Sequence, residues 1–225
     1  VQVLSRNHYL GEIVFDFSND PKERYKIHEI HDSQSEKLDP NPFENFIKSH
    51  KKKMGELQES EQSQMSGVKK EIKQLPTARS CMDCHQAQAQ KWMKTPHSLA
   101  YFTLLRSEEG SNLTCVKCHS VGLGDKRGFS RVQDIVVFKQ QKNQDMESKK
   151  LQKLRAQYWK DVRHELSGVE SVRALGPQKT KKFAKAWIKV DKKHKVKHNF
   201  ANVQCLNCHE TSIDHPFEMN KADLT

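Results

Sequence analysis

Alternating apolar positions near the start of the chain indicate a β-hairpin. Apolar residues occupy every second position from Ile13 to Phe17, and the turn-forming sequence Asn-Asp-Pro follows at 19–21. Residues 25–30 offer a second strand of similar length. The pattern therefore predicts two short strands that pair with each other.

From Phe43 onward the apolar residues recur at steps of three and four, which is typical of an amphipathic α-helix. This pattern continues to Leu75, and Pro76 then removes the backbone donor that a further turn would need. We therefore expect one long or interrupted helix that ends at Pro76.

Two further helices are indicated in the second half of the chain. Thr95 and Pro96 fit the cap and first residue of a helix that turns His97 inward. Another helix is indicated by the apolar spacing over residues 151–166, and a basic stretch over 179–197 follows it. The remaining segments are predicted as loops, so the expected fold class is mainly α with much irregular loop.

The composition is polar and basic. Hydrophobic residues make up 35% of the chain and charged residues 30%, and 39 Lys and Arg against 28 Asp and Glu give a formal charge of +11. We expect such a chain to build an ordinary apolar core only with difficulty, so another group should fill its interior. No nucleic-acid-binding motif accompanies the scattered lysines, which argues against a nucleic-acid partner. No apolar run approaches the roughly 20 residues of a membrane span.

All six cysteines fall into three copies of one motif, Cys-x-x-Cys-His. A structural zinc site would need two such pairs for each ion, and three pairs do not divide that way. A redox disulfide of the thioredoxin type would need a strand before the pair and a helix after it, which these polar surroundings do not provide. The motifs are Cys81-Met82-Asp83-Cys84-His85, Cys115-Val116-Lys117-Cys118-His119 and Cys205-Leu206-Asn207-Cys208-His209.

This spacing suits the covalent attachment of haem. Two thiols three positions apart can each form a thioether to a haem vinyl group, while the adjacent histidine binds the iron. We therefore expect three covalently bound haems c in a haem-cored domain, with His85, His119 and His209 as proximal ligands. The motifs set a domain boundary after residue 76, with residues 1–76 as an N-terminal segment and 77–225 as the trihaem domain.

The remaining histidines supply candidates for the second axial ligand of each iron. His97 is expected on the inner side of its helix, and His215 lies just past the third motif. His50, His164 and His198 are further candidates for the third haem, and a methionine is the alternative ligand type.

Three blocks within residues 80–216 resemble the cytochrome c-554 type multihaem cytochromes. The first is the motif at 81–85 with Trp92 and the sequence Pro-His-Ser-Leu-Ala at 96–100. The second runs from the motif at 115–119 to Gly-Phe at 128–129, and the third joins Asn-Val-Gln at 202–204 to the last motif and His215. The resemblance implies that His97 and His215 are distal ligands, each of a haem attached elsewhere in the sequence. The chain departs from the family where Glu-Thr-Ser at 210–212 replaces Gly-Pro-Gly and where a fourth motif is absent.

Residues 1–55 resemble, over short stretches, the C-terminal end of a 5′-nucleotidase-like metallophosphoesterase domain. Tyr-Leu-Gly-Glu-Ile at 9–13 is similar to its closing strand, and residues 43–51 are similar to the helix after it. The resemblance implies that the chain is the C-terminal part of a larger protein whose phosphoesterase ligands lie upstream, so that activity is not expected here.

The function expected from these features is electron transfer to and from redox partner proteins, rather than catalysis. Because c-type haem attachment implies export and residues 1–3 (Val-Gln-Val) do not resemble the start of a signal peptide, we expect a processed or partial chain in the periplasm or outside the cell. An enzyme with one open-site haem, acting on a small nitrogen or sulfur oxide, is the alternative. A haem module of a larger fusion, an oligomer or a filament is the third possibility.

Overall fold

The computed structural model describes residues 2–3, 9–13, 25–29, 42–64, 74–139 and 149–209. The chain forms two compact units, Val1–His50 and Lys51–Thr225. The domain boundary expected after residue 76 stays a prediction.

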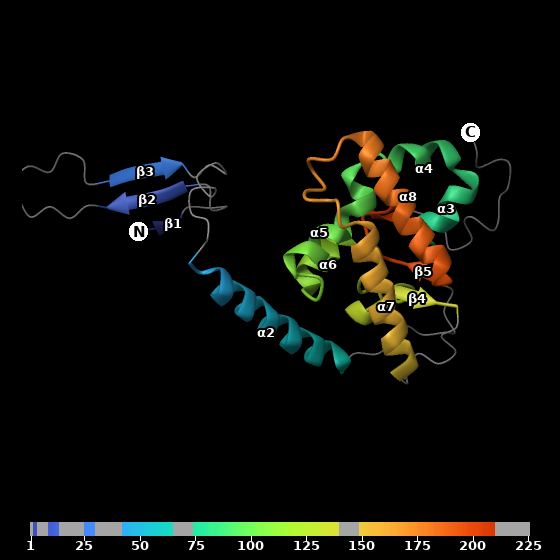
Figure 1. Ribbon diagram of the computed structural model, residues 1–225, viewed down its shortest axis with the longest axis horizontal. Coiled ribbons are helices and arrows are strands. Elements are labelled where there is room, and N and C mark those ends of the chain that lie inside the picture. The colour runs from blue at the N-terminus through green and yellow to red at the C-terminus, as the bar shows by residue number, and fades with distance from the viewer. Residues whose placement is uncertain are drawn as a thin grey trace, which may run out of the picture. The chain divides into compact units, whose positions relative to one another are not determined.

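The N-terminal unit contains a pair of antiparallel strands, the second of which was predicted. Strand β2 (Tyr9–Ile13) pairs antiparallel with β3 (Tyr25–Glu29), and the short β1 (Gln2–Val3) pairs with the other edge of β2 (Figure 1). The second strand lies where the sequence pattern placed it. The first ends at Ile13, where the predicted strand was to begin, and residues 14–24 lie outside the described residues.

The predicted long helix is present as α2 (Glu44–Ser63). Residues 65–73 lie outside the described residues, and Leu75 is buried in a non-helical segment whose amide donates to the carbonyl oxygen of Arg127 at 2.9 Å. Apolar side chains of this region are solvent-exposed at Phe43, Phe46, Ile47, Met54 and Leu57.

Short helices carry the first two motifs. The first motif lies at the end of α3 (Ala78–Cys84) and the second in α6 (Leu113–His119). Between them lie α4 (Gln86–Trp92), the 3-10 helix η3 (Pro96–Leu99) and α5 (Ala100–Ser107). The helix predicted to start at Pro96 is confirmed, with Thr95 at its N-cap position.

The segment between the second and third motifs folds into two helices and a two-stranded sheet. The predicted helix is confirmed as α7 (Lys149–Glu165), and the basic stretch predicted without a structure forms α8 (Pro177–Lys193). Strand β4 (Val136–Phe138) pairs antiparallel with β5 (Val196–Asn199). The 3-10 helices η4 (Val132–Asp134) and η5 (Cys205–Asn207) complete the described elements of this unit.

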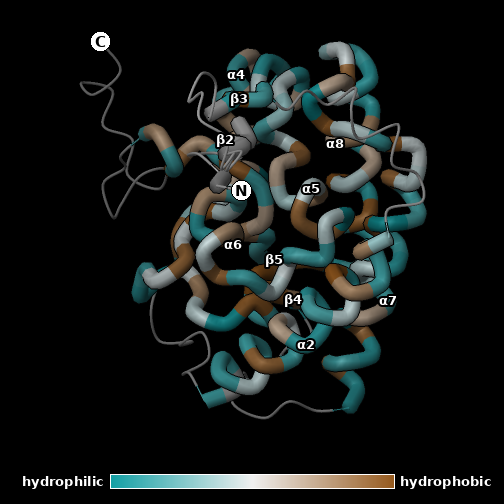
Figure 2. The backbone as a smooth tube through the Cα atoms, turned by 90° about the vertical axis from the view of Figure 1, so that its left-hand side faces the viewer, coloured by the Kyte–Doolittle hydropathy of each residue, from teal (hydrophilic) through white to brown (hydrophobic). Residues whose placement is uncertain are grey.

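The larger unit has an ordinary hydrophobic core, so the expectation that a chain this polar builds one only with difficulty was wrong. Many of the buried apolar residues belong to α7, α8, β4 and β5, and hydrophobic and hydrophilic residues alternate along these elements (Figure 2). The average composition of the chain does not reveal this separation, because the many polar residues lie on the surface. Tyr158 is fully buried and makes edge-to-face contacts with Phe138 and Trp159, at ring-centroid distances of 5.7 and 4.9 Å. The fold is mainly helical, as predicted, and the larger unit contains a core of buried side chains, while haem at the centre of the domain stays a prediction.

Candidate haem-binding site

Each motif occupies about one helical turn. The first ends α3, where the His85 amide donates to the carbonyl oxygen of Cys81 at 2.9 Å. The third uses the same bond, from the His209 amide to Cys205 at 2.9 Å, around η5. In a helical turn the positions i, i+3 and i+4 share one face, so both thiols and the imidazole of a motif lie on the same side.

None of the six cysteines forms a disulfide, and the second cysteine of each motif is solvent-exposed. The first cysteines of motifs one and three, Cys81 and Cys205, line the same cavity and lie close enough to shift each other's pKa. The interaction between the two thiols lowers the pKa of Cys205 to about 6 and, with burial, raises the pKa of Cys81. Two motifs that are far apart in the sequence therefore bring their thiols together.

Motifs one and three line one cavity of about 230 Å³. Its walls include His85 and His209 of the two motifs together with His97. Trp92 and Val203 contribute apolar surface and are joined by a hydrogen bond from the indole Nε1 to the Val203 carbonyl oxygen at 2.8 Å. His97 itself is exposed, although the sequence placed it on the inner face of its helix, because this cavity opens to solvent.

The chain segment before the third motif holds this arrangement together. The buried Gln204 side chain accepts a hydrogen bond from the Ala78 amide at the start of α3, and donates to the carbonyl oxygens of Asn199 and Ala201, both at 2.7 Å. The Val203 amide donates to the carbonyl oxygen of His97 at 3.2 Å. These bonds connect the first motif, the third motif and His97.

Asn202 has a left-handed backbone, with φ of 77°. Its side-chain oxygen accepts from the Tyr101 amide at 2.9 Å, and its own amide donates to the His119 carbonyl oxygen at 3.0 Å. Asparagine is one of the few residues other than glycine that tolerates this conformation. Asn202 can therefore form this left-handed turn before the third motif without a glycine.

In the second motif, the geometry of His119 fixes its tautomer. Its Nδ1 lies 2.7 Å from the carbonyl oxygen of Ala100 and 3.1 Å from the hydroxyl of Thr103. Because a carbonyl can only accept, Nδ1 carries the proton, and Nε2 is left with a lone pair. Histidines that bind metals are oriented by such a bond from their second nitrogen. The residues of this motif therefore fit a haem.

The other candidate ligands are less constrained. His198 on β5 is half-buried and stacks on Phe200, its Nδ1 has no hydrogen-bond partner among the described residues, and burial lowers its pKa to about 4. His164 on α7 and His50 on α2 are exposed, and His50 stacks on Phe46. His215 lies outside the described residues.

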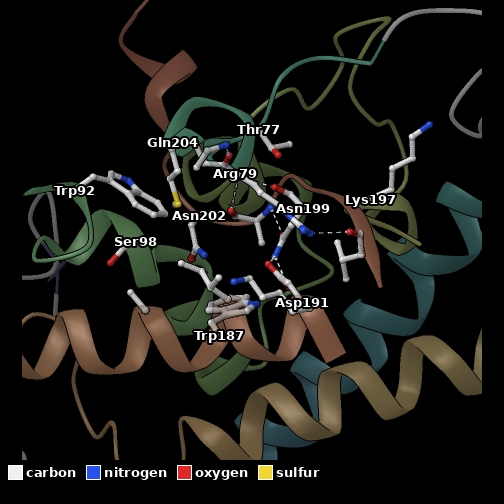
Figure 3. A pocket seen from close by; sticks show the side chains of 17 residues that line it. Thr77, Arg79, Trp92, Ser98, Trp187, Asp191, Lys197, Asn199, Asn202 and Gln204 are labelled. Carbon is white, nitrogen blue, oxygen red and sulfur yellow. Dashed lines mark hydrogen bonds between the residues drawn. The ribbon is translucent and has the colours of Figure 1, made fainter. Parts of the chain in front are cut away.

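A second, smaller cavity of about 60 Å³ lies between α3 and α8 (Figure 3). Asp191 of α8 lines it and accepts hydrogen bonds from the Tyr158 hydroxyl at 2.7 Å and from the Asn199 amide at 3.1 Å. Burial raises the pKa of this carboxyl to about 6. Arg79 and Lys197 also line this cavity.

Sequence reasoning assigned no role to Gln204, Asn202 or Asp191. Gln204 and Asn202 stand in the third block of the resemblance, and that position was the signal that could have pointed to them. Within the described ranges, no group of three or more His, Cys, Asp or Glu side chains is arranged to hold a metal ion. None of the described helices is both long and apolar enough to span a membrane.

Residues 80–143 match the family model of cytochrome c554 and c-prime. This range contains the first two motifs, His97 and the glycine-containing segment after the second motif. Comparisons with curated proteins and with solved structures found no match. The match confirms the resemblance to these cytochromes over residues 80–143, and the third block of the resemblance lies outside the matched range.

Proposed function

We propose that this protein transfers electrons through three covalently bound haems c, one on each Cys-x-x-Cys-His motif. The family match supports a cytochrome role in electron transfer with haem c as the cofactor. The third motif lies outside the matched residues, and its haem is inferred from the same spacing and the same helical turn.

The observation that carries this proposal is the cavity shared by motifs one and three. Both motifs and His97 line it, so the attachment points Cys81 and Cys205 lie in the wall of the same cavity. Haem bound at each motif supplies a one-electron couple. Cys81 and Cys205, with the second cysteine of each motif, would hold the two haems, and Trp92 and Val203 would limit the solvent contact of the bound groups.

The proximal ligands in this proposal are His85, His119 and His209. His97 is proposed as a distal ligand within the shared cavity, and His215 as the second. The third distal ligand is proposed to be His50, His164 or His198. A His at every distal position would close the irons to small molecules, which favours electron transfer over the alternative of an open-site enzyme.

The proposed location is outside the cytoplasm, in the periplasm or beyond, because haem c attachment takes place on exported chains. The partners proposed are redox proteins, and the chain can work alone, in an oligomer or as a module of a larger protein.

The proposal is tested by counting haems. The intact mass should exceed the 26.2 kDa polypeptide by three haems that resist extraction with acidic acetone. Replacing Cys205 and Cys208 by serine should remove one haem, and the equivalent change at Cys81 and Cys84 should remove another. Extractable haem, or an unchanged count in the first variant, would disprove attachment at the third motif. Stoichiometric carbon monoxide binding to the reduced parent would favour the enzyme instead.

A further inference from the structure

The exposed side of α8 is a continuous row of lysines. Lys179, Lys182, Lys185, Lys189 and Lys192 are all solvent-exposed and follow one another at steps of three and four, so they form one stripe about 20 Å long. The opposite side of the helix is buried in the core at Thr180, Ala184, Trp187 and Val190. We call these five residues the lysine stripe.

Among the described residues, no acidic side chain forms an ion pair with the lysine stripe. Within the described part of the chain, the α8 lysine that forms an ion pair is Lys193, with Asp161 at 2.7 Å, and Lys193 lies outside the stripe. The one carboxylate of α8, Asp191, is hydrogen-bonded to Tyr158 and Asn199. By contrast, exposed lysines of α2 pair with glutamates of the same helix, as Lys48 does with Glu44 at 2.6 Å.

This charge pattern works against the helix that carries it. Like charges at steps of three and four repel each other, and cations near a helix N-terminus oppose its dipole. The first turn of α8 contains no acidic residue. A row of charges that lowers the stability of its own helix indicates a role outside folding.

The lysine stripe adjoins the first motif. Helix α8 lies beside α3 and α4 in Figure 1, and Ile188, Asp191 and Lys192 face Ala78 and Met82 of α3 across the smaller cavity. Arg79 of α3 and Lys197 of β5 border the same cavity (Figure 3). A protein that docks on the stripe would therefore be next to the first haem-binding motif.

We propose that the lysine stripe is the docking surface for an acidic redox protein that exchanges electrons at the first motif. This inference rests on the proposed function. Complementary charge over a surface of this length steers diffusing partners and raises their association rate, and it does so most at low salt.

The test uses the full haem-loaded chain and a flavodoxin, a small acidic electron-transfer protein, as the probe. The stripe variant Lys182→Gln/Lys185→Gln/Lys189→Gln is compared with Lys53→Gln/Lys126→Gln/Lys150→Gln, which removes as many charges from exposed positions elsewhere. Binding between the oxidised proteins is measured by calorimetry, and reduction by flavodoxin hydroquinone is measured by stopped flow.

At low ionic strength, the stripe variant should have about tenfold lower affinity for flavodoxin than the parent and about tenfold slower reduction by it. The control variant should match the parent in both measurements. The difference should vanish in high salt. Equal losses in both variants would overturn the proposal. The proposal would also be overturned if the parent, but not the stripe variant, bound anionic phosphatidylglycerol vesicles while both were reduced by flavodoxin at the same rate. Reduction by dithionite distinguishes failure of the docking proposal from failure of the proposed function, because a parent that dithionite cannot reduce would refute electron transfer itself.

Discussion

Gln204 provides the sharpest test of the structure around the motifs. Its buried amide makes three hydrogen bonds, to Ala78, Asn199 and Ala201. Methionine has a similar shape but makes none of them, so Gln204→Met would leave buried backbone groups without partners. At about 1 kcal/mol for each bond, the variant should lose about 3 kcal/mol of unfolding free energy.

For a unit of this size, that loss corresponds to a melting temperature about 6–12 °C lower. Urea denaturation of the haem-loaded protein measures the free energy, and hydrogen exchange at the Ala78 amide reports the bond to α3 directly. Gln178→Met is the matched control, because Gln178 is exposed on α8 and should change stability by less than about 0.5 kcal/mol. A loss below 1 kcal/mol for Gln204→Met, or unchanged exchange at Ala78, would refute the proposed linking role.

Three further predictions concern single residues. Asn202→Ala should cost about 2–3 kcal/mol, from the left-handed backbone and the lost bond to Tyr101, and Asn202→Gly about 1 kcal/mol; equal costs in denaturation would exclude backbone strain. The pKa of Asp191 is raised from 3.8 to about 6, so the folded state holds a proton that the unfolded chain releases, and stability should fall by about 2 kcal/mol as pH rises from 4 to 6. Asp191→Asn should lack this component, and parallel pH profiles of the two proteins would contradict it. His97→Ala should convert one low-spin haem per molecule to high spin in electron paramagnetic resonance; an unchanged spectrum would show that His97 is not a ligand.

Sequence patterns were reliable where they concern local chemistry. The cysteine motifs are short and self-contained, and the apolar periods of α2 and α7 follow from the 3.6-residue helical repeat. The helix at Pro96 was marked by its first residues.

Patterns failed where structure depends on distant contacts or on the balance of charge. Helix α8 was hidden by its many lysines, although Ala184, Trp187 and Val190 have helical spacing. His97 was placed inward because periodicity cannot distinguish a core from a cavity open to solvent. The pairing of Cys81 with Cys205 joins residues on separate helices, and nothing in the local sequence of either motif encodes it.

The segment around Gln204 also has a consequence for how the protein matures. The bond between Gln204 and Ala78 spans 126 positions, that between Trp92 and Val203 spans 111, and that between Tyr101 and Asn202 spans 101. Contacts of such long range form late in folding, and only after most of the chain has been synthesised. We therefore expect the first two motifs to emerge on a nascent chain with their thiols still apart from those of the third. Haem attachment during export would then meet separate, accessible motifs, and closure around the third would be the last step of assembly.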